Sequence, residues 1–504
     1  MHNVRSAVFA TMKKILLTIS AILLASSAFA QEQSMEDFRK QALAEFRSFS
    51  KQAKKEYRDF RAKANAEYAE FLKEAWKEFE LKPEIIPPKV DPPVQPVAPP
   101  RISDKPISPK PLVFSDVKPI TKPTTPKMPR IDVPKVTPEE EPLILKMPVK
   151  FYGATCNIRL KPGTGEVQVA DASETTISNA WTKLADGRYD LMLADCIATR
   201  DSLRLCDWGY YLLTKRVAEE FCEAKNTNNT KMLQAYLMTQ AGYKIRLARA
   251  DNKLFLMFPS KSTIYKAKMF KMDGANYYML DDDFTGSCIY VSKAAFPGEQ
   301  GFSINMAEQP RFPYEASAVK THKSVRYPDV SISVATNKNL IDFYNAFPRT
   351  SWDILAYSSL SKQAKEVLYP VLRNAIAGKD EAAAANILIN FVQTGFQYKT
   401  DNEQFGYERP LFGDETLFYP YSDCEDRSIL YAILVRELLG LDVALVYYPG
   451  HLATAVCFKG GPYGDFFNVG EKKYTICDPT FIGANIGLTM TGMDNSKAEL
   501  TLLQ

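Results

Sequence analysis

The sequence predicts an α+β fold arranged in several consecutive parts. Three observations support this prediction. An 11-residue repeat runs from Met35 to Phe79, and a proline-rich stretch follows it from Pro83 to Pro148. From Val149 to the C-terminus, the apolar residues alternate between helical spacing and strand spacing. A chain of 504 residues is too long for a single hydrophobic core, so we expect several domains.

Residues 1–30 have the features of a secretory signal peptide. Lys13 and Lys14 precede the apolar run from Ile15 to Leu24, and Ala28-Phe29-Ala30 forms a cleavage site of the small-x-small type. Neither this run nor any later segment reaches the ~18 uninterrupted apolar residues of a membrane-spanning helix. We therefore expect an exported, soluble protein with no membrane span, periplasmic if the cell has an outer membrane.

The charge balance gives no reason to expect nucleic-acid binding, and the cysteine content gives none to expect a disulfide framework. The chain has 63 basic and 59 acidic residues and a formal net charge of +4, so nothing favours nucleic acid as a partner. Its eight cysteines fit no compact disulfide framework, although export would permit disulfides. We expect no cofactor and no metal ion.

The repeat predicts a long amphipathic helix over residues 31–82. Eleven residues make three turns at 3.67 residues per turn, so equivalent residues align on one side of a helix about 65–70 Å long. Two interpretations stay open: residues 35–79 bind a second copy or an envelope partner, for example as a right-handed coiled coil, or the helix folds back on this protein's own domains. The aligned residues are Phe38, Phe49, Phe60 and Phe71; Phe46, Tyr57, Tyr68 and Phe79; Ala42, Ala53, Ala64 and Ala75; and Glu45, Glu56, Glu67 and Glu78.

Residues 83–148 are expected to form a linker. They hold 19 of the 32 prolines of the chain. Proline at this density disfavours both helix and sheet ladders, which leaves an extended tether with a reach of up to roughly 200 Å at ~3.1 Å per residue.

Two α+β domains are expected after the linker, over residues 149–335 and 336–504. In the first, a helix and several strands follow one another with ordinary turns, and the second opens with helical spacing. The expected strands are 150–158, 166–169, 244–249, 254–258, 302–306 and 330–334, and the expected helices are 208–222 and 382–394.

The stretch "YPYSDCEDRSILYAILVRELLG" predicts a helix with a cysteine at its start. The apolar face lies further along, at Ile429, Leu430, Ile433 and Leu434, so Cys424 lies at the polar end. A cap at Ser422 or Asp423 would place Cys424 in the first turn, where free N–H groups and the helix dipole favour a thiolate. Cys424 is therefore the candidate nucleophile.

Two strands that follow this helix supply partners for a nucleophilic cysteine. His451 begins a strand after the turn in "VALVYYPG", and the next strand, "KKYTICDPTF", ends at Asp478. Cysteine catalysis needs a thiolate, a base close to it and a group that orients the base. Adjacent strands would bring Asp478 to the second ring nitrogen of His451, which predicts a Cys424, His451, Asp478 triad.

The segment "SDCEDRSILYAILVRELLGLDVALVYYPGHLATAV" with "YTICDPTF" resembles the core of the transglutaminase-like superfamily, which has a papain-like α+β fold. The resemblance covers residues 391–481 and implies that Cys424 is the nucleophile, His451 the base and Asp478 the orienting acid. Members often carry an aromatic after the histidine, whereas this chain has Leu452 and Ala453.

The resemblance implies chemistry on amide bonds through an acyl-enzyme on the cysteine. The superfamily contains hydrolases that cut peptide or isopeptide bonds, acyltransferases that cross-link amines to glutamine, and members that only bind. We expect hydrolysis of a peptide or protein substrate, because water is always present whereas transfer needs a site that selects an amine. Amine acyl transfer and a non-catalytic envelope scaffold are the alternatives.

Further residues near the triad are candidates for supporting roles. The backbone N–H of Cys424 is one expected oxyanion donor, and Tyr421, Gln404 or Gln393 would supply the second. Two alternatives concern other cysteines: a zinc site built from Cys424, His451, Cys457 and Cys477, and a disulfide between Cys457 and Cys477. The aromatic residues before the nucleophile would wall the cleft, although packing in the core explains them equally well; they are Phe405, Tyr407, Phe412, Phe418 and Tyr419.

Residues 149–335 also align with the C-terminal domain, which suggests an internal duplication. The position of the nucleophile falls within Asn226 to Thr230, where there is no cysteine, so this copy would be degenerate. The alternative is that any helix, glycine and pair of strands aligns in this way. The aligned pairs are Gly242 with Gly440, Lys253 with His451, and Asp281 with Asp478.

Overall fold

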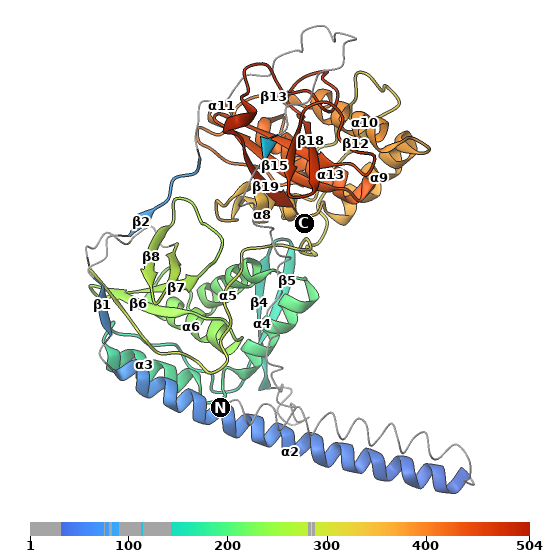
Figure 1. The fold of residues 1–504 in the computed structure, drawn as a ribbon. Helices are drawn as coiled ribbons and strands as arrows, with labels where there is room; N and C mark the ends of the chain where they lie inside the picture. The colour runs from blue at the N-terminus through green and yellow to red at the C-terminus, as the bar shows by residue number, and fades with distance from the viewer. Residues whose placement is uncertain are drawn as a thin grey trace. The chain divides into compact units, whose positions relative to one another are not determined.

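The computed structural model of the chain describes residues 32–74, 76–79, 83–89, 112–113, 143–280, 284 and 288–503 (Figure 1). These residues form a mixed α/β structure. The chain divides into two compact units, Met1–Ala64 and Asn65–Gln504. The signal peptide expected at residues 1–30 and the aligned Asp281 lie outside the described residues.

The repeat forms a single helix, α2 (Glu32–Lys73), which is shorter than the expected 31–82. Beyond it, β1 (Lys77–Phe79) pairs antiparallel with β10 (Ile289–Val291) at the edge of a sheet. The 11-residue repeat therefore extends to Phe79 in the sequence, whereas the helix ends at Lys73. Hydrogen bonds to the sheet edge are available to residues 77–79, and such long-range pairing outweighs a local helical pattern.

Parts of the proline-rich stretch belong to sheets, contrary to the expectation of a plain tether. β2 (Glu84–Ile85) pairs with β8 (Lys268–Met272), and β3 (Leu112–Val113) pairs in parallel with β17 (Phe466–Val469). Both are edge strands, where proline-containing segments are tolerated because one side of the backbone needs no ladder partner. The rest of residues 90–142 lies outside the described residues.

The first half of the larger unit combines a hairpin, four helices and a seven-stranded sheet. β4 (Leu145–Phe151) and β5 (Ala154–Leu160) form the hairpin, so the single strand expected at 150–158 turns back at Gly153. The sheet order is β1-β10-β6-β7-β9-β8-β2, with antiparallel neighbours throughout. The other elements are α3 (Glu174–Leu184), α4 (Asp190–Ser202), α5 (Asp207–Phe221), α6 (Asn228–Gln240), β6 (Arg246–Ala250), β7 (Lys253–Pro259) and β9 (Ala275–Met279).

Two expected strands, 166–169 and 302–306, are irregular segments. Their backbone groups bond to side chains instead of a ladder: Val169 N donates to Asn229 Oδ1 (2.8 Å), and Ser303 N donates to Asp207 Oδ2 (2.9 Å). The apolar alternation of both segments serves burial in the core and not pairing in a sheet.

The second half contains a six-stranded sheet in the order β19-β15-β16-β18-β17-β3. The helix α13 (Cys424–Leu439) packs against two of these strands and against α8, α10 and α12. Its residues from Cys424 to Val435 are all buried, as expected for a helix that has neighbours on every side. The elements are α7 (Lys338–Asn345), α8 (Trp352–Tyr357), α9 (Lys362–Ile376), α10 (Glu381–Thr394), β13 (Gln397–Tyr398), α11 (Asp401–Gln404), α12 (Gly413–Phe418), β14 (Tyr421–Ser422), β15 (Asp442–Tyr448), β16 (His451–Cys457), β18 (Lys472–Cys477), the 3₁₀ helix η2 (Asn495–Lys497) and β19 (Glu499–Leu503).

The expected boundary between residues 335 and 336 falls too late. The hairpin of β11 (Lys320–Lys323) and β12 (Ser331–Val334) packs on α9 and α10 and so belongs with the second half. His322 on β11 lies within hydrogen-bonding distance of the carbonyl oxygens of Gly395 (3.1 Å) and Leu417 (3.3 Å). This histidine therefore has a structural role in attaching the hairpin.

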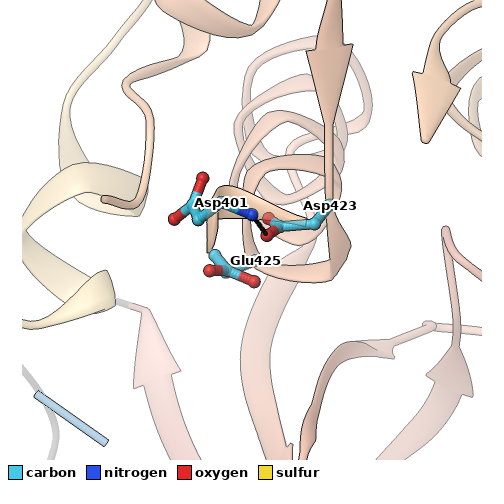
Figure 2. A group of neighbouring side chains, drawn as sticks. All are labelled: Asp401, Asp423 and Glu425. Carbon is cyan, nitrogen blue, oxygen red and sulfur yellow. Dashed lines mark hydrogen bonds between the residues drawn. The ribbon is translucent and has the colours of Figure 1, made fainter. Parts of the chain in front are cut away.

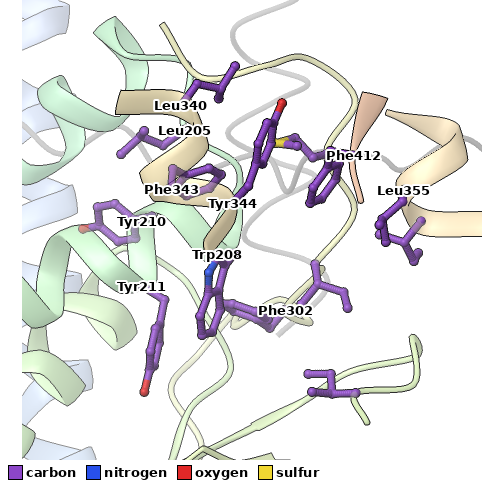
Figure 3. Packing of buried hydrophobic residues seen from close by; sticks show 14 of the residues in the cluster. Leu205, Trp208, Tyr210, Tyr211, Phe302, Leu340, Phe343, Tyr344, Leu355 and Phe412 are labelled. Atoms are coloured by element: carbon purple, nitrogen blue, oxygen red, sulfur yellow. The ribbon is translucent and has the colours of Figure 1, made fainter. Parts of the chain in front are cut away.

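The two halves share one hydrophobic core. Figure 3 shows Trp208 of α5 near Phe343 of α7, and these two side chains belong with Tyr211 and Phe412 to the same buried cluster. Trp208 Nε1 also donates to the carbonyl oxygen of Ala346 across this contact (3.0 Å). The two expected domains are thus parts of one compact unit.

The two sheets have the same topology, as an internal duplication requires. The strands β10-β6-β7-β9-β8 and β19-β15-β16-β18-β17 follow the same sequence-to-space order, and a helix precedes each set. Lys253 and His451 are each the first residue of the second strand, as aligned. The helices begin at Asn228 and Cys424, so Asn228 takes the nucleophile position in the first copy.

Candidate active site

Cys424 is the first residue of α13, as the sequence predicted. Asp423 precedes it in an extended conformation, and its N–H donates to Asp426 Oδ2 (3.2 Å), which fixes the start of the helix. One turn later, Ser428 Oγ donates to the carbonyl oxygen of Leu452 on β16 (2.9 Å). These contacts hold the thiol beside the strand that carries the histidine.

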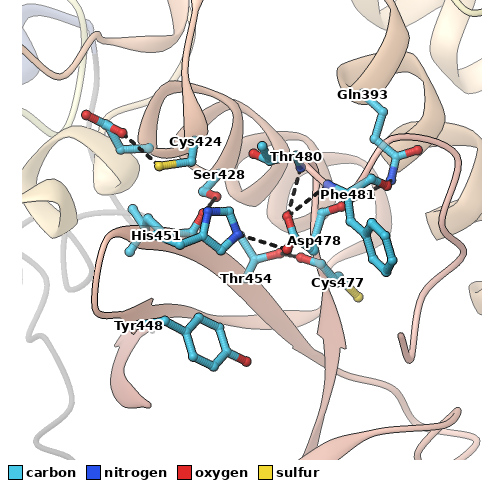
Figure 4. Close-up of polar contacts among 12 residues, drawn as sticks. Gln393, Cys424, Ser428, Tyr448, His451, Thr454, Cys477, Asp478, Thr480 and Phe481 are labelled. Carbon is cyan, nitrogen blue, oxygen red and sulfur yellow. Dashed lines mark hydrogen bonds and ion pairs between the residues drawn. The ribbon is translucent and has the colours of Figure 1, made fainter. Parts of the chain in front are cut away.

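His451 is the first residue of β16, directly after a tight turn. Gly450 in this turn has a φ of 79°, a left-handed conformation that suits glycine. The register of β15 and β16 pairs Tyr448 with His451. Because the hairpin returns at this point, the imidazole lies at the end of the sheet next to the N-terminus of α13 (Figure 4).

Asp478 follows the last residue of β18, and backbone groups orient its carboxylate. Oδ1 accepts hydrogen bonds from the N–H groups of Thr480 (2.8 Å) and Phe481 (3.2 Å). Oδ2 lies 2.8 Å from His451 Nε2. The strand β18 pairs with β16 in the register Thr454 to Cys477, which brings the aspartate alongside the histidine.

The three side chains lie in the order Cys424, His451, Asp478, with the imidazole between the other two (Figure 4). Nδ1 of His451 is buried and has no hydrogen-bond partner among the described residues, and it faces the side on which Cys424 lies. Burial opposes the charged imidazole, but the Asp478 carboxylate outweighs it and, with Cys424 close by, raises the pKa of His451 to about 10. The imidazole is therefore protonated at neutral pH.

Three buried acidic side chains, Asp401, Asp423 and Glu425, lie close together at the start of α13 (Figure 2). The Cys424 thiol donates a hydrogen bond to Glu425 Oε2 (3.1 Å), and Asp401 N donates to Asp423 Oδ2 (3.1 Å). Oxygen atoms of Asp401, Asp423 and Glu425 lie within 4.8 Å of one another, and these three residues are buried. Among the described residues, this is the one group of His, Cys, Asp and Glu side chains close enough to hold a metal ion.

Burial and mutual repulsion keep most of this acidic group neutral. Burial, reinforced by Asp423 and Asp426, raises the pKa of Asp401 to about 11. Burial, reinforced by Asp423, also raises the pKa of Glu425 well above its usual range, whereas burial raises that of Asp423 only to about 6. At neutral pH the charge beside the thiol is consequently much smaller than three carboxylates would give.

A cleft of about 470 Å³, including space open to solvent, leads to Cys424 and His451. Its lining includes Asp401, Glu408 and Glu425. Trp352, Tyr447 and Lys89 contribute the larger side chains, and Lys89 Nζ lies 2.6 Å from Glu499 Oε2 and 4.1 Å from the Tyr447 ring centre.

None of the three side chains expected as the second oxyanion donor lines this cleft. Gln393 is buried, and its Nε2 donates to the carbonyl oxygens of Asp478, Phe481 and Ala484 at 2.8–3.1 Å. Its amide thus holds the loop after Asp478 and is not available to a substrate. Gln404 Nε2 points to the Tyr421 carbonyl (3.5 Å), and Tyr421 itself pairs with Gln397 in a short parallel ladder.

The expected aromatic wall is also wrong. None of Phe405, Tyr407, Phe412, Phe418 and Tyr419 lines the cleft; Phe412 stacks on Tyr344 in the core (4.3 Å between ring centres), and Phe405 and Tyr419 flank Arg409. The aromatic lining comes instead from Trp352 and Tyr447, which lie in segments far from Cys424 in the sequence.

Neither alternative for the other cysteines is realised. Cys477 pairs in register with Thr454, three residues before Cys457, so the two cysteines lie about 10 Å apart along the strands, beyond the reach of a disulfide. Both carry free thiols. The four residues considered for zinc do not gather, since the acidic group is the one such cluster in the described part of the chain.

Sequence reasoning missed several residues of the cleft. Glu425 adjoins the nucleophile in "SDCEDR", so the acidic run around the cysteine was the signal available. Lys89 and Trp352 gave no local signal because they come from the proline-rich stretch and from α8. Asn228 is the first residue of α6, as Cys424 is of α13, and it bonds to the backbone of Asn252 and Leu254, which joins the helix start to β7.

Comparison of the chain with family models, with curated proteins and with solved structures finds no match. Within the residues that the structure describes, no helix has both the length and the apolar character needed to cross a membrane.

Proposed function

We propose that the protein is a cysteine-nucleophile hydrolase of amide bonds in peptides or proteins. The observation that carries this proposal is the placement of the His451 ring, which has Asp478 at one nitrogen and Cys424 on the side of the other. A protonated imidazole next to a thiol favours the thiolate, and the neutral Glu425 adds little opposing charge.

In the proposed reaction, the Cys424 thiolate attacks the carbonyl carbon of the amide. A sulfur–carbon bond forms, and the carbonyl oxygen becomes an oxyanion near the N-terminus of α13, where the Cys424 N–H is the expected donor. His451 then transfers its proton to the nitrogen, the carbon–nitrogen bond breaks, and the amine leaves. Asp478 keeps the imidazole oriented and favours its charged form.

Water completes the reaction. His451, now neutral, accepts a proton from a water molecule that attacks the thioester. The sulfur–carbon bond breaks, a carboxylic acid is released, and the thiolate and imidazolium are restored. The net change is the addition of one water across the amide bond.

The topology supports assignment to the transglutaminase-like superfamily as part of this proposal. Its features are a cysteine at a helix start, a histidine at the start of the second strand that follows, and an aspartate at the end of a neighbouring strand. An aromatic after the histidine is replaced by Leu452, which lines the cleft.

Acyl transfer to an amine is the second candidate. The lining of the cleft favours it, because it includes Glu408 and Asp423, and a carboxylate there would attract an amine to the thioester. Running the reaction in water enriched in ¹⁸O, with an amine added, distinguishes the two reactions. Hydrolysis places ¹⁸O in the new carboxyl group, whereas transfer yields an amide with the added amine.

A peptide carrying a vinyl sulfone in place of the scissile amide tests the proposal. We expect a covalent adduct on Cys424 alone, reduced at least about 100-fold in His451→Ala and unchanged in Cys222→Ser, a control outside the cleft. Labelling spread over several cysteines, or equal labelling in His451→Ala, would rule out an activated nucleophile.

A further inference from the structure

The helix α2 presents a column of exposed aromatic side chains. Phe46, Phe49 and Phe60 are 63%, 37% and 55% exposed, and Phe71 near the end of the helix is 47% exposed. Large apolar side chains repeated along one side of a helix are costly to leave in water and typically mark an interface.

The last part of the helix, from Asn65, belongs to the larger unit and is buried on a side that overlaps the column in part. Asn65, Tyr68 and Leu72, spaced three and four residues apart, are at most 5% exposed. Asn65 Oδ1 accepts a hydrogen bond from Trp181 Nε1 (3.1 Å), and the Tyr68 ring lies 4.4 Å from the Trp181 ring centre. Tyr68 continues the 11-residue series of Phe46 and is buried here, whereas Phe71, in the series of Phe49 and Phe60, stays exposed. The buried end therefore uses the Phe46 series and leaves the Phe49 series open.

The 11-residue repeat of the column requires a partner helix with the same repeat. The aromatic and alanine positions recur every 11 residues along α2, which is ~63 Å long at 1.5 Å per residue. Only a helix with an equal repeat keeps its own apolar positions in contact with this column over that length, with a slight right-handed supercoil. A second copy of the same helix meets this condition.

The charges beside the column select the relative orientation. Glu45 and Glu56 lie on one flank, and Arg39 and Arg61 lie on the other. Gln41 and Gln52 each donate to the glutamate one turn further on, at 3.2 and 3.0 Å. A parallel pair places the glutamate flank of one helix against the arginine flank of the other, whereas an antiparallel pair places like charges together.

The phenylalanines supply about half of the area of a stable interface. At ~150–250 Å² per aromatic side chain, the exposed parts of Phe46, Phe49 and Phe60 amount to roughly 300 Å² on each helix. Two helices then contribute about 600 Å² from phenylalanine alone. Alanines and the aliphatic stems of the flanking glutamates supply further area toward the ~1,200 Å² of a stable interface.

From these observations, we infer that the protein forms a parallel homodimer through α2. The aromatic column of one chain packs against that of a second copy, with the small side chains of Ala42 and Ala53 between the rings. This inference does not depend on the proposed catalytic function.

Analytical ultracentrifugation of the chain from Gln31 onward tests the inference. We expect a dimer in the unmodified protein and a dissociation constant at least about 100-fold weaker in the double variant Phe49→Asp/Phe60→Asp. The matched control is Ala44→Asp/Ala62→Asp, which adds the same charge on the opposite, exposed side of the helix and should leave the dimer intact. Circular dichroism checks that both variants keep their helix content.

Cross-linking tests the orientation. Ala53→Cys should form a disulfide-linked dimer under oxidation, because equivalent positions face each other in a parallel pair, and Ala62→Cys should not. A monomer at all concentrations, or a dimer that tolerates Phe49→Asp/Phe60→Asp, would overturn the inference. A dimer that depends on the phenylalanines but does not cross-link at residue 53 would overturn its parallel arrangement.

Discussion

At the scale of single residues, two opposing effects set the pKa of His451, namely its burial and the nearby Asp478 carboxylate. Burial alone would lower the pKa of an imidazole, as it does for His322, the other described histidine. At His451 the aspartate reverses this effect, because Asp478 is held by two backbone N–H groups that aim its second oxygen at Nε2. The loop after β18, which orients Asp478, therefore helps to keep His451 protonated.

This environment predicts how stability depends on pH. The pKa of His451 rises from 6.5 to about 10 on folding, so its contribution to the free energy of unfolding is complete below pH 6.5 and is lost as the pH rises through 10. In Asp478→Asn we expect the free energy of unfolding to fall by about 1–3 kcal/mol at pH 6 and by much less at pH 10.5. Urea unfolding across this range measures the difference.

His322→Asn provides the control for this prediction. Burial lowers the pKa of His322 despite its two carbonyl partners, so it is neutral in both the folded and the unfolded state above about pH 7.5. The cost of replacing it should be constant between about pH 7.5 and 10. A constant cost for Asp478→Asn over the same range would contradict a charged His451.

At the scale of elements, the start of α13 depends on Asp426. Its Oδ2 accepts from the N–H of Asp423 (3.2 Å) and its Oδ1 from the N–H of Leu411 (2.8 Å), so one side chain fixes both the helix cap and the preceding loop. Burial and the nearby Asp423 raise the pKa of Asp426 well above its usual range. This residue positions Cys424 without touching it.

Removal of the Asp426 side chain should therefore lower the free energy of unfolding. In Asp426→Ala, two buried N–H groups lose their partner, and we expect a loss of about 1–3 kcal/mol in the free energy of unfolding. Denaturant titration measures this loss. Asp494→Ala, at the exposed cap of η2, should cost about 1 kcal/mol or less. Equal costs for the two variants would contradict the structural role of Asp426.

Elements with strong local patterns were predictable from the sequence, and those set by distant partners were not. α10, α13, β6 and β7 follow their apolar periodicity, and a helix start before Cys424 follows from its cap. The end of α2 did not follow, because residues 77–79 pair with β10, more than 200 positions away. The same holds for the site. The triad was predictable because it lies on elements with clear local patterns, whereas Trp352 and Lys89 reach the cleft only through the tertiary fold.

At the scale of the whole molecule, residues 65–504 behave as one unit because their two halves share a core. Trp208 on α5 is 4% exposed, and it joins α7 both by packing and by its hydrogen bond to the Ala346 carbonyl. The proline-rich stretch reinforces this unit at the sheet edges through β2 and β3. The two sheets have the same strand order, and Asn228 begins the helix before one sheet as Cys424 begins the helix before the other.

The shared core predicts cooperative unfolding of the larger unit. Calorimetry should show one transition for residues 65–504, and Trp208→Ala should lower the free energy of that transition by about 3–5 kcal/mol. Trp352→Ala, a half-buried tryptophan at the cleft, serves as the control and should cost less. Two separate transitions in the unmodified protein would show that the halves fold as independent domains.

The rate of Cys424 alkylation by iodoacetamide between pH 5 and 9 shows whether His451 activates this thiol. An ordinary cysteine, with a pKa of ~8.5, is less than about 1% thiolate at pH 6 and reacts slowly there. We predict that Cys424 reacts at pH 6 on the order of 100-fold faster in the unmodified protein than in His451→Ala, with mass spectrometry locating the label. Equal rates in the two proteins across this range would contradict the account.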